Sequence, residues 1–257
     1  MKSFFHIFYQ LRGVFLENSA KNKISSASWR IKDGEYRLLA SPSLGGPHKI
    51  PYVSQYASAE LAERFVKNDE FLREDPKWRE SGAETIDEYV FWAPKLCGMA
   101  CFSMILQSLG CPTPKLVELG KQAMAAGCYL PDPKNPKRLI GLLHKPCLKF
   151  ARQFGFEGKL LWFIGPSVVA REILKNNFVI ASVNHDIRYA GAKPENKQGH
   201  LVLVHGFKID GGKVTGFYIH NPSGFFGISQ ENHFVSAEDF VSCFSGRIIV
   251  LFSSWCG

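Results

Sequence analysis

The sequence has no apolar run that approaches the roughly 18 residues of a membrane-spanning helix. It also has no CxxC pair, no HExxH helix and neither of the glycine-rich phosphate-binding loops, GxGxxG and GxxxxGK[ST]. Period-two alternation is expected to point His200 and His205 to opposite faces of one strand, which argues against a shared metal ion. We therefore expect no membrane span, no cofactor and no metal.

Charge of one sign is not concentrated anywhere. The 31 Lys and Arg exceed the 23 Asp and Glu, but they are scattered, so the net charge of +8 does not indicate nucleic-acid binding. The apolar start of the chain is interrupted by polar residues and no small-residue cleavage site follows, which does not fit a signal peptide. Seven cysteines, an odd number without a tight repeat, then fit reduced thiols in a cytoplasmic protein.

The 257 residues, 46% of them hydrophobic, suit one well-packed domain that needs no disulfides. Residues 1–15 have an apolar helical face, which we interpret as packing on the domain. The alternative is contact of this N-terminal helix with a partner or a membrane surface. Asp33 and Gly34 then predict the turn of a β-hairpin over residues 29–39.

The rest of the chain predicts helices first and strands second. Residues 59–96 are acidic and helix-prone, and residues 97–109 are apolar on every side, as in a helix buried in a core. This order predicts the α+β class, with a central buried helix packed on an antiparallel sheet. Further helices are expected over 114–126, 139–154, 167–176 and 237–244, and strands over 159–164, 178–184, 200–209, 213–221 and 247–253.

Cys97 is the first candidate for chemistry, because it lies where a loop enters the apolar helix. The unpaired backbone N–H groups at a helix N-terminus favour a thiolate over a thiol. Gly98, directly after it, allows close approach of a second chain or a substrate. The alternative is a buried structural cysteine, as we interpret Cys101 one turn later.

His200 and Asn221 are the second candidate, since a thiolate nucleophile needs a base and that base needs an orienting group. His200 begins the strand HLVLVHGF, and Asn221 ends the next strand. If a tight turn at 211–212 pairs these strands, the two side chains lie next to each other. The alternative is a pair of ordinary polar residues at a sheet edge.

Five sequence blocks in register resemble the C39-type, papain-like cysteine peptidases. In that family a V/I-P-Y-x-S-Q strand precedes C-G-x-A at the nucleophilic helix, a G-H strand carries the base, and a D/N-P-x-G turn carries the orienting residue, so residues 50–55 are expected to form a strand. The resemblance spans about residues 50–253. The matching blocks are IPYVSQ (50–55), CGMACFSMIL (97–106), VIASVNH (179–185), GHLVLVHGF (199–207) and YIHNPSG (218–224).

The resemblance implies a thiol protease, a hydrolase that cleaves a peptide bond through a thioester acyl-enzyme. Carried over, Cys97 is the nucleophile, His200 the general base and acid, and Asn221 the group that orients the imidazole. Gln55 matches the oxyanion-hole glutamine, although 41 residues separate it from Cys97, where many relatives have about ten or fewer. A peptide or protein is the implied substrate, and a precursor or leader peptide is one such substrate. The alternatives are a non-catalytic papain-like binding module and a transpeptidase or acyltransferase with the same triad.

The same comparison predicts the domain organisation. Residues 1–49 lie outside the resemblance and form an N-terminal extension, while residues 50–257 form the catalytic domain with a helical insertion at 59–96. The insertion carries Tyr89, Phe91 and Trp92 near Cys97 in sequence. We hypothesise that these aromatic side chains form an apolar wall of a substrate cleft, the alternative being that they belong to the core.

Overall fold

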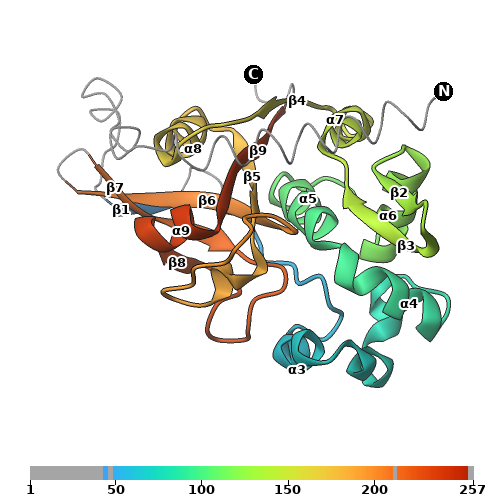
Figure 1. Cartoon of the computed structure of the whole chain (residues 1–257). Helices are drawn as coiled ribbons and strands as arrows, with labels where there is room; N and C mark the ends of the chain where they lie inside the picture. The colour runs from blue at the N-terminus through green and yellow to red at the C-terminus, as the bar shows by residue number, and fades with distance from the viewer. Residues whose placement is uncertain (1–42, 46–48, 211–212, 254–257) are drawn as a thin grey trace.

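The computed structural model describes residues 43–45, 49–210 and 213–253. The helix predicted over residues 1–15 and the hairpin predicted over residues 29–39 lie outside these ranges. Figure 1 shows the arrangement of the described chain: the large sheet with α8 and α9 lies on one side, helices α3, α4 and α6 lie on the other, and α5 lies between them.

Within the described ranges the large sheet is antiparallel throughout and has seven strands. A short strand, β1 (Ser43–Gly45), pairs with the second half of β6, beyond the part that β5 covers. The remaining strands lie in the order β4 (Phe156–Leu161), β9 (Phe244–Ser253), β5 (Phe178–Val183), β6 (His200–Asp210), β7 (Lys213–His220) and β8 (His233–Ser236).

Both faces of this sheet are buried, and the alternation of side chains divides them between two cores. On β6, Leu201 and Leu203 pack against the helices around α5. Val202 and Val204 point the other way, into a second core beneath α8 (Pro166–Leu174) and α9 (Ala237–Cys243). The protein is therefore α+β, with helices packed on an antiparallel sheet, as the sequence predicts.

The helical half lies on the α5 side of the sheet. Among the described residues, no single helix is long and apolar enough to cross a membrane, and the one helix pair that passes together is bent by 84°. The elements are η2 (Ala59–Leu61), α3 (Ala62–Lys67), η3 (Asp69–Glu74), η4 (Trp78–Ser81), α4 (Ile86–Trp92), η5 (Ala93–Lys95), α5 (Cys97–Ser108), α6 (Leu116–Ala125), the hairpin β2 (Tyr129–Asp132) and β3 (Asn135–Leu142), and α7 (His144–Arg152).

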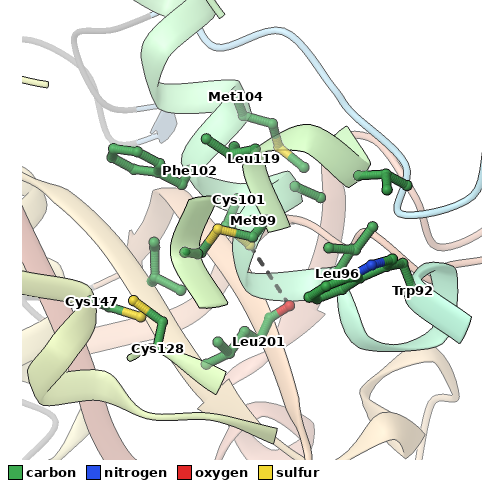
Figure 2. Packing of buried hydrophobic residues seen from close by; sticks show 14 of the residues in the cluster. Trp92, Leu96, Met99, Cys101, Phe102, Met104, Leu119, Cys128, Cys147 and Leu201 are labelled. Carbon is green, nitrogen blue, oxygen red and sulfur yellow. Dashed lines mark hydrogen bonds between the residues drawn. The ribbon is translucent and has the colours of Figure 1, made fainter. Parts of the chain in front are cut away.

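Helix α5 is the central buried helix that its all-round apolar sequence predicts. Every residue from Gly98 to Leu106 is buried, and the thiol of Cys101 contacts the carbonyl oxygen of Leu201 on β6 at 3.7 Å (Figure 2). A methyl group at Gly98 would lie 2.4 Å from the side chain of Leu142, at the end of β3, and 2.8 Å from the Leu201 side chain. The missing side chain at position 98 therefore admits a strand of the same chain, β6, against the first turn of α5.

A buried carboxylate connects the 59–96 segment to the chain that precedes it. Asp75, 1% exposed, accepts hydrogen bonds from the Ser58 hydroxyl (2.6 Å), the Ser58 amide (3.1 Å) and the Tyr89 hydroxyl. The Tyr89 oxygen in turn accepts the amide of Ala57 at 3.1 Å. These bonds tie α4 and the end of η3 to residues 57–58, which lie two residues after Gln55. That residues 59–96 are an insertion stays a prediction.

The structure corrects three expectations. Residues 50–55 join no strand; side-chain and backbone hydrogen bonds hold them against residues 220–222 instead. The helix expected over 139–154 begins only at His144, because residues 139–142 belong to β3 of a hairpin that the sequence analysis missed. Strand β8 was missed as well. Its four residues are too few for a convincing alternating pattern.

Candidate active site

His200 and Asn221 meet at one end of the sheet. His200 Nε2 lies 2.8 Å from Asn221 Oδ1, and both side chains are buried, at 2% and 0% exposed. The pairing of β6 with β7 brings them together, since His200 is the first residue of β6 and Asn221 directly follows β7. The hairpin geometry that the sequence predicts for these two residues is confirmed.

A tight turn fixes the position of Asn221. The amide of Gly224 donates to the carbonyl oxygen of Asn221 at 2.9 Å, and the Asn221 amide donates to the carbonyl oxygen of Gln230 at 2.8 Å. The hydroxyl of Tyr52 donates to the same Asn221 oxygen at 3.0 Å. The IPYVSQ segment is therefore packed directly on the turn that carries Asn221.

The hydrogen bonds around Asn221 also define the tautomer of His200. The amide of Ser223 donates to Asn221 Oδ1 at 3.2 Å, so this atom is an acceptor and the side-chain amide has one orientation. His200 Nε2 must then carry the proton that it donates to Oδ1. The other ring nitrogen, Nδ1, keeps its lone pair, and it is buried without a hydrogen-bond partner. This is the form in which an imidazole acts as a base.

Cys97 is the first residue of α5 and lies against the start of β6. The residue as a whole is half-buried, but its sulfur is enclosed by protein, and the amide of Leu201, the residue after His200, is among the groups that stabilise its thiolate. The side chain of Leu96 at the N-cap makes no capping hydrogen bond, so it does not occupy the first amides of the helix. The structure thus confirms that Cys97 lies at a helix N-terminus, and it shows that the start of the His200 strand lies against it.

The protonation states differ from the expectation that the helix N-terminus alone would produce a thiolate. Burial raises the pKa of the Cys97 thiol to about 11, outweighing the amides of Leu201 and Gly98 that lower it. Burial, followed by the neighbouring His185, lowers the pKa of His200 well below its usual value. The resting pair is therefore a neutral thiol and a neutral imidazole.

Gln55 lies beside the segment that leads into α5, despite the long separation in sequence. It is 4% exposed, and its Nε2 donates to the carbonyl oxygen of Ala93 at 3.0 Å. Its backbone amide donates to the carbonyl oxygen of Pro222, next to Asn221, at 2.9 Å. A primary amide has a second N–H. Gln55 thus bridges the Asn221 turn and the approach to Cys97 with one donor to spare.

Tyr89 and Trp92 of the 59–96 segment do not form the proposed wall, whereas Phe91 is partly exposed and packs edge-to-face on Trp92 with ring centroids 5.4 Å apart. Tyr89 is fully buried, and Trp92 is 4% exposed and packs edge-to-face on Tyr129 with ring centroids 5.5 Å apart. Figure 2 shows Trp92 among the core side chains beside Leu96. The hydrophobic surface of Tyr89 and Trp92 is used in the core, which is the alternative that the sequence analysis left open.

Three site residues escaped the sequence analysis. The ring of His185 stacks on that of His200, with centroids 5.0 Å apart and planes 23° from parallel. The Ser223 hydroxyl lies 3.2 Å from His200 Nε2, and Arg188 donates to that hydroxyl at 2.9 Å. Short polar segments such as NHDIR carry no periodic signal, so only the folded chain shows that they meet His200.

The six cysteines in the described part of the chain are all free. Figure 2 shows the sulfurs of Cys128 and Cys147 beside each other in the core. Within the described residues no group of three or more His, Cys, Asp or Glu side chains is arranged to hold a metal ion.

No family model matches the sequence. No curated protein matches it either. Among solved structures, the fold is similar to a double-glycine motif protease from an AMS/PCAT transporter, determined in complex with the leader peptide, with a TM-score of 0.38 and 20% identity over 62% of this chain and 84% of that one. It is also similar to pepW from Lactobacillus rhamnosis HN001, with a TM-score of 0.28 and 11% identity over 92% and 88% of the two chains. Both TM-scores and both identities are low, so these similarities say nothing about the chemistry of this chain.

Proposed function

We propose that this chain is a cysteine peptidase that hydrolyses a peptide bond with Cys97, His200 and Asn221. One observation carries the proposal: Asn221 fixes His200 in the tautomer whose free nitrogen is Nδ1, on the strand that packs against Cys97. A nucleophile, a base and a group that orients the base are the three parts that acyl transfer by a thiol requires. The five C39-like sequence blocks support the same assignment.

The neutral resting pair determines how the reaction starts. As the Cys97 sulfur attacks the scissile carbonyl carbon, its proton passes to His200 Nδ1. The tetrahedral intermediate then collapses, the C–N bond breaks, and the imidazolium returns the proton to the leaving amine. A thioester remains on Cys97. Water, deprotonated by the same nitrogen, attacks it, and the acid product leaves as the thiol is restored.

Two donors are available for the oxyanion of each tetrahedral intermediate. The Cys97 amide belongs to the first turn of α5, where backbone N–H groups have no partner within the helix. The spare N–H of Gln55 is the other donor, at a side chain held in place through Ala93. Loss of one such donor typically costs about 100- to 1000-fold in kcat.

The substrate class follows from the reaction and from the sequence resemblance. A peptide or protein is the substrate, and processing of a precursor or leader peptide is the narrower form of the proposal. Reduced cysteines fit action in a cytoplasm. Release of the acyl group to an amine instead of water would make the same site a transpeptidase.

The test is digestion of a synthetic peptide library by the full chain, with products identified by mass spectrometry. Cleavage that disappears in Cys97→Ser and His200→Ala but persists in Cys111→Ser, a control at another half-buried cysteine, supports the proposal. Product that forms only when an amine acceptor is added identifies a transferase. Binding of peptides without any turnover identifies a binding module and rejects the peptidase.

A further inference from the structure

Arg188 is a buried cation beside the candidate active site. It is the last residue of η6 (His185–Arg188), the short turn that follows β5, and it is 6% exposed. Its Nε donates to the carbonyl oxygen of His185 at 2.9 Å, and its Nη2 donates to the Ser223 hydroxyl at 2.9 Å. Both partners are neutral oxygens, so they orient the guanidinium without balancing its charge.

No carboxylate of the described residues lies within 4.0 Å of this guanidinium. Asp186 acts on it only at longer range, and burial lowers the pKa of Arg188. An arginine stays protonated even so. A buried charge without a counter-charge is costly, and such groups are normally paired. The free donors of Arg188 are thus suited to an anion that the protein itself does not provide.

The position of Arg188 indicates which part of a substrate would carry that anion. Ser223 connects it to His200, since the Ser223 hydroxyl lies 2.9 Å from Arg188 and 3.2 Å from His200 Nε2. His200 returns a proton to the leaving amine in the proposed reaction. The segment after the scissile bond therefore passes on the His200 side of Cys97. Arg188 lies on that side as well, at the Nε2 edge of the ring beyond the Nδ1 that returns the proton.

The surroundings of Arg188 extend from the site to the protein surface. The Phe225 ring lies under the guanidinium at 5.3 Å and contacts Tyr189 with ring centroids 5.7 Å apart. Tyr189 is 48% exposed. On the inner side, both Arg188 and Cys97 interact electrostatically with the Tyr56 hydroxyl. Burial raises the pKa of Tyr56 to about 12, and the charge of Arg188 opposes this rise. Arg188 thus has both the candidate site and exposed aromatic surface close to it.

We propose that Arg188 binds a carboxylate on the leaving segment of the substrate and makes this peptidase selective for an anionic group just after the cut. The carboxylate is either an Asp or Glu side chain or the C-terminus of the substrate. A planar guanidinium pairs with either through two parallel N–H···O bonds. This inference rests on the proposed peptidase function and adds the substrate class that the site accepts.

The experiment uses the full chain with a peptide library in which each position varies and each peptide is made both as a C-terminal acid and as an amide. The variants are Arg188→Gln, Arg188→Lys and Arg152→Gln, the last being a control at a surface arginine paired with Glu157. For the best cut sites, kcat and KM are measured on matched Glu and Gln peptides. Cys97 labelling by iodoacetamide is recorded for every variant.

We expect cuts to be favoured by at least about tenfold where a carboxylate follows, with Arg188→Gln removing the preference mainly through KM. Arg188→Lys should keep part of it, because the charge remains but the paired bonds do not. Preference for internal Glu over Gln identifies a side-chain carboxylate; preference for acids over amides identifies a C-terminal one. If Cys97 is labelled but no peptide is cut, protection of Cys97 from labelling is measured instead of turnover. We then expect Gly-Glu amide to protect Cys97 more strongly than Gly-Gln amide does, or Gly-Ala to protect it more strongly than Gly-Ala amide does.

Several outcomes would overturn the inference. Cleavage or protection without a charge preference, or a preference that survives Arg188→Gln, removes Arg188 as the binding residue. An equal loss of cleavage on Glu and Gln peptides in Arg188→Gln would mean that Arg188 only supports Ser223 and His185. In these cases Cys97 still labels and the peptidase proposal stands, whereas an inert Cys97 removes both.

Discussion

The imidazole of His200 and the side-chain amide of Asn221 are joined by a 2.8 Å hydrogen bond, buried at the end of two neighbouring strands. Because Ser223 holds Asn221 Oδ1 as an acceptor, this bond sets both the orientation and the tautomer of the base. The oxygen of Asn221, more than its nitrogen, is the functional part of the side chain.

Asn221→Ala should therefore lower kcat far more than it raises KM, by about 100-fold or more, in the range of general-base contributions. Asn221→Asp keeps an acceptor at the same place and should restore most of the rate. Steady-state kinetics on a library-derived peptide measure both variants. Equal losses in the Ala and Asp variants would mean that the orienting bond is not what matters.

The turn after Asn221 should be intolerant of a side chain at position 224. A methyl group at Gly224 would lie 2.1 Å from the carbonyl oxygen of Ser229, a backbone atom that cannot rotate away. We expect Gly224→Ala to lower the free energy of unfolding by more than about 3 kcal/mol, at the upper end of overpacking costs. Urea unfolding measures this.

Gly227→Ala is the matched control for that variant. Gly227 has a φ of +69° but nothing within 4 Å of an added methyl group, so only the backbone strain of about 1–2 kcal/mol applies. If both alanine variants lose the same stability, the close approach at Gly224 is not a constraint.

Removal of the Asp75 carboxylate should loosen the 59–96 segment. Asp75→Ala leaves the Ser58 amide and hydroxyl and the Tyr89 hydroxyl without their acceptor, and each unsatisfied buried group costs about 1–3 kcal/mol. We expect a loss of at least about 3 kcal/mol in the free energy of unfolding and faster hydrogen exchange in α4. Asp87→Ala, which removes a surface pair with Arg73, should cost less than about 1 kcal/mol. A small effect for Asp75→Ala would contradict the role of this network.

Stability should fall as the solution becomes acidic, partly because of His205. Its Nε2 is buried without a partner, its ring stacks on His220 at 4.2 Å, and burial together with His220 lowers its pKa to about 3. An unfolded histidine titrates near 6.5, so the stability that His205 contributes is complete above that pH and is lost on acidification towards its folded pKa.

Replacing His205 by Phe tests this linkage. Between about pH 6 and pH 4, the wild type should lose about 1.4 kcal/mol per pH unit more than His205→Phe. Urea unfolding at a series of pH values provides the slopes, and the two curves should run parallel near pH 8. Parallel curves in acid as well would show that His205 is protonated in the folded state.

The sequence predicted the helices and strands in which apolar residues recur at a regular spacing. Alternation on strands 200–209 and 213–221 placed His200 next to Asn221 correctly, and the apolar run after Cys97 predicted the buried helix. The short hairpin β2–β3 was missed because residues 139–142 continue into α7 with a helix-like apolar spacing.

The polar and charged residues around His200 could not be predicted from sequence patterns. Arg188, Ser223 and His185 come from two separate turns, and their convergence on His200 is a product of the tertiary fold. The protonation states of Cys97 and His200 also depend on the tertiary fold. A helix N-terminus favours the thiolate of Cys97, but the depth at which α5 is buried, which only the structure shows, outweighs it.

The central claim is that His200 activates Cys97, and alkylation by limiting iodoacetamide at about pH 7 tests it most directly. Mass spectrometry compares adducts at Cys97 and at the half-buried Cys111 in wild type, His200→Ala and the control His233→Ala. The account predicts faster labelling of Cys97 than of Cys111 and an at least tenfold loss in His200→Ala only, because the neutral imidazole accepts the thiol proton as the sulfur attacks the reagent. Labelling of Cys97 that is no faster than that of Cys111, or that survives His200→Ala, would contradict it.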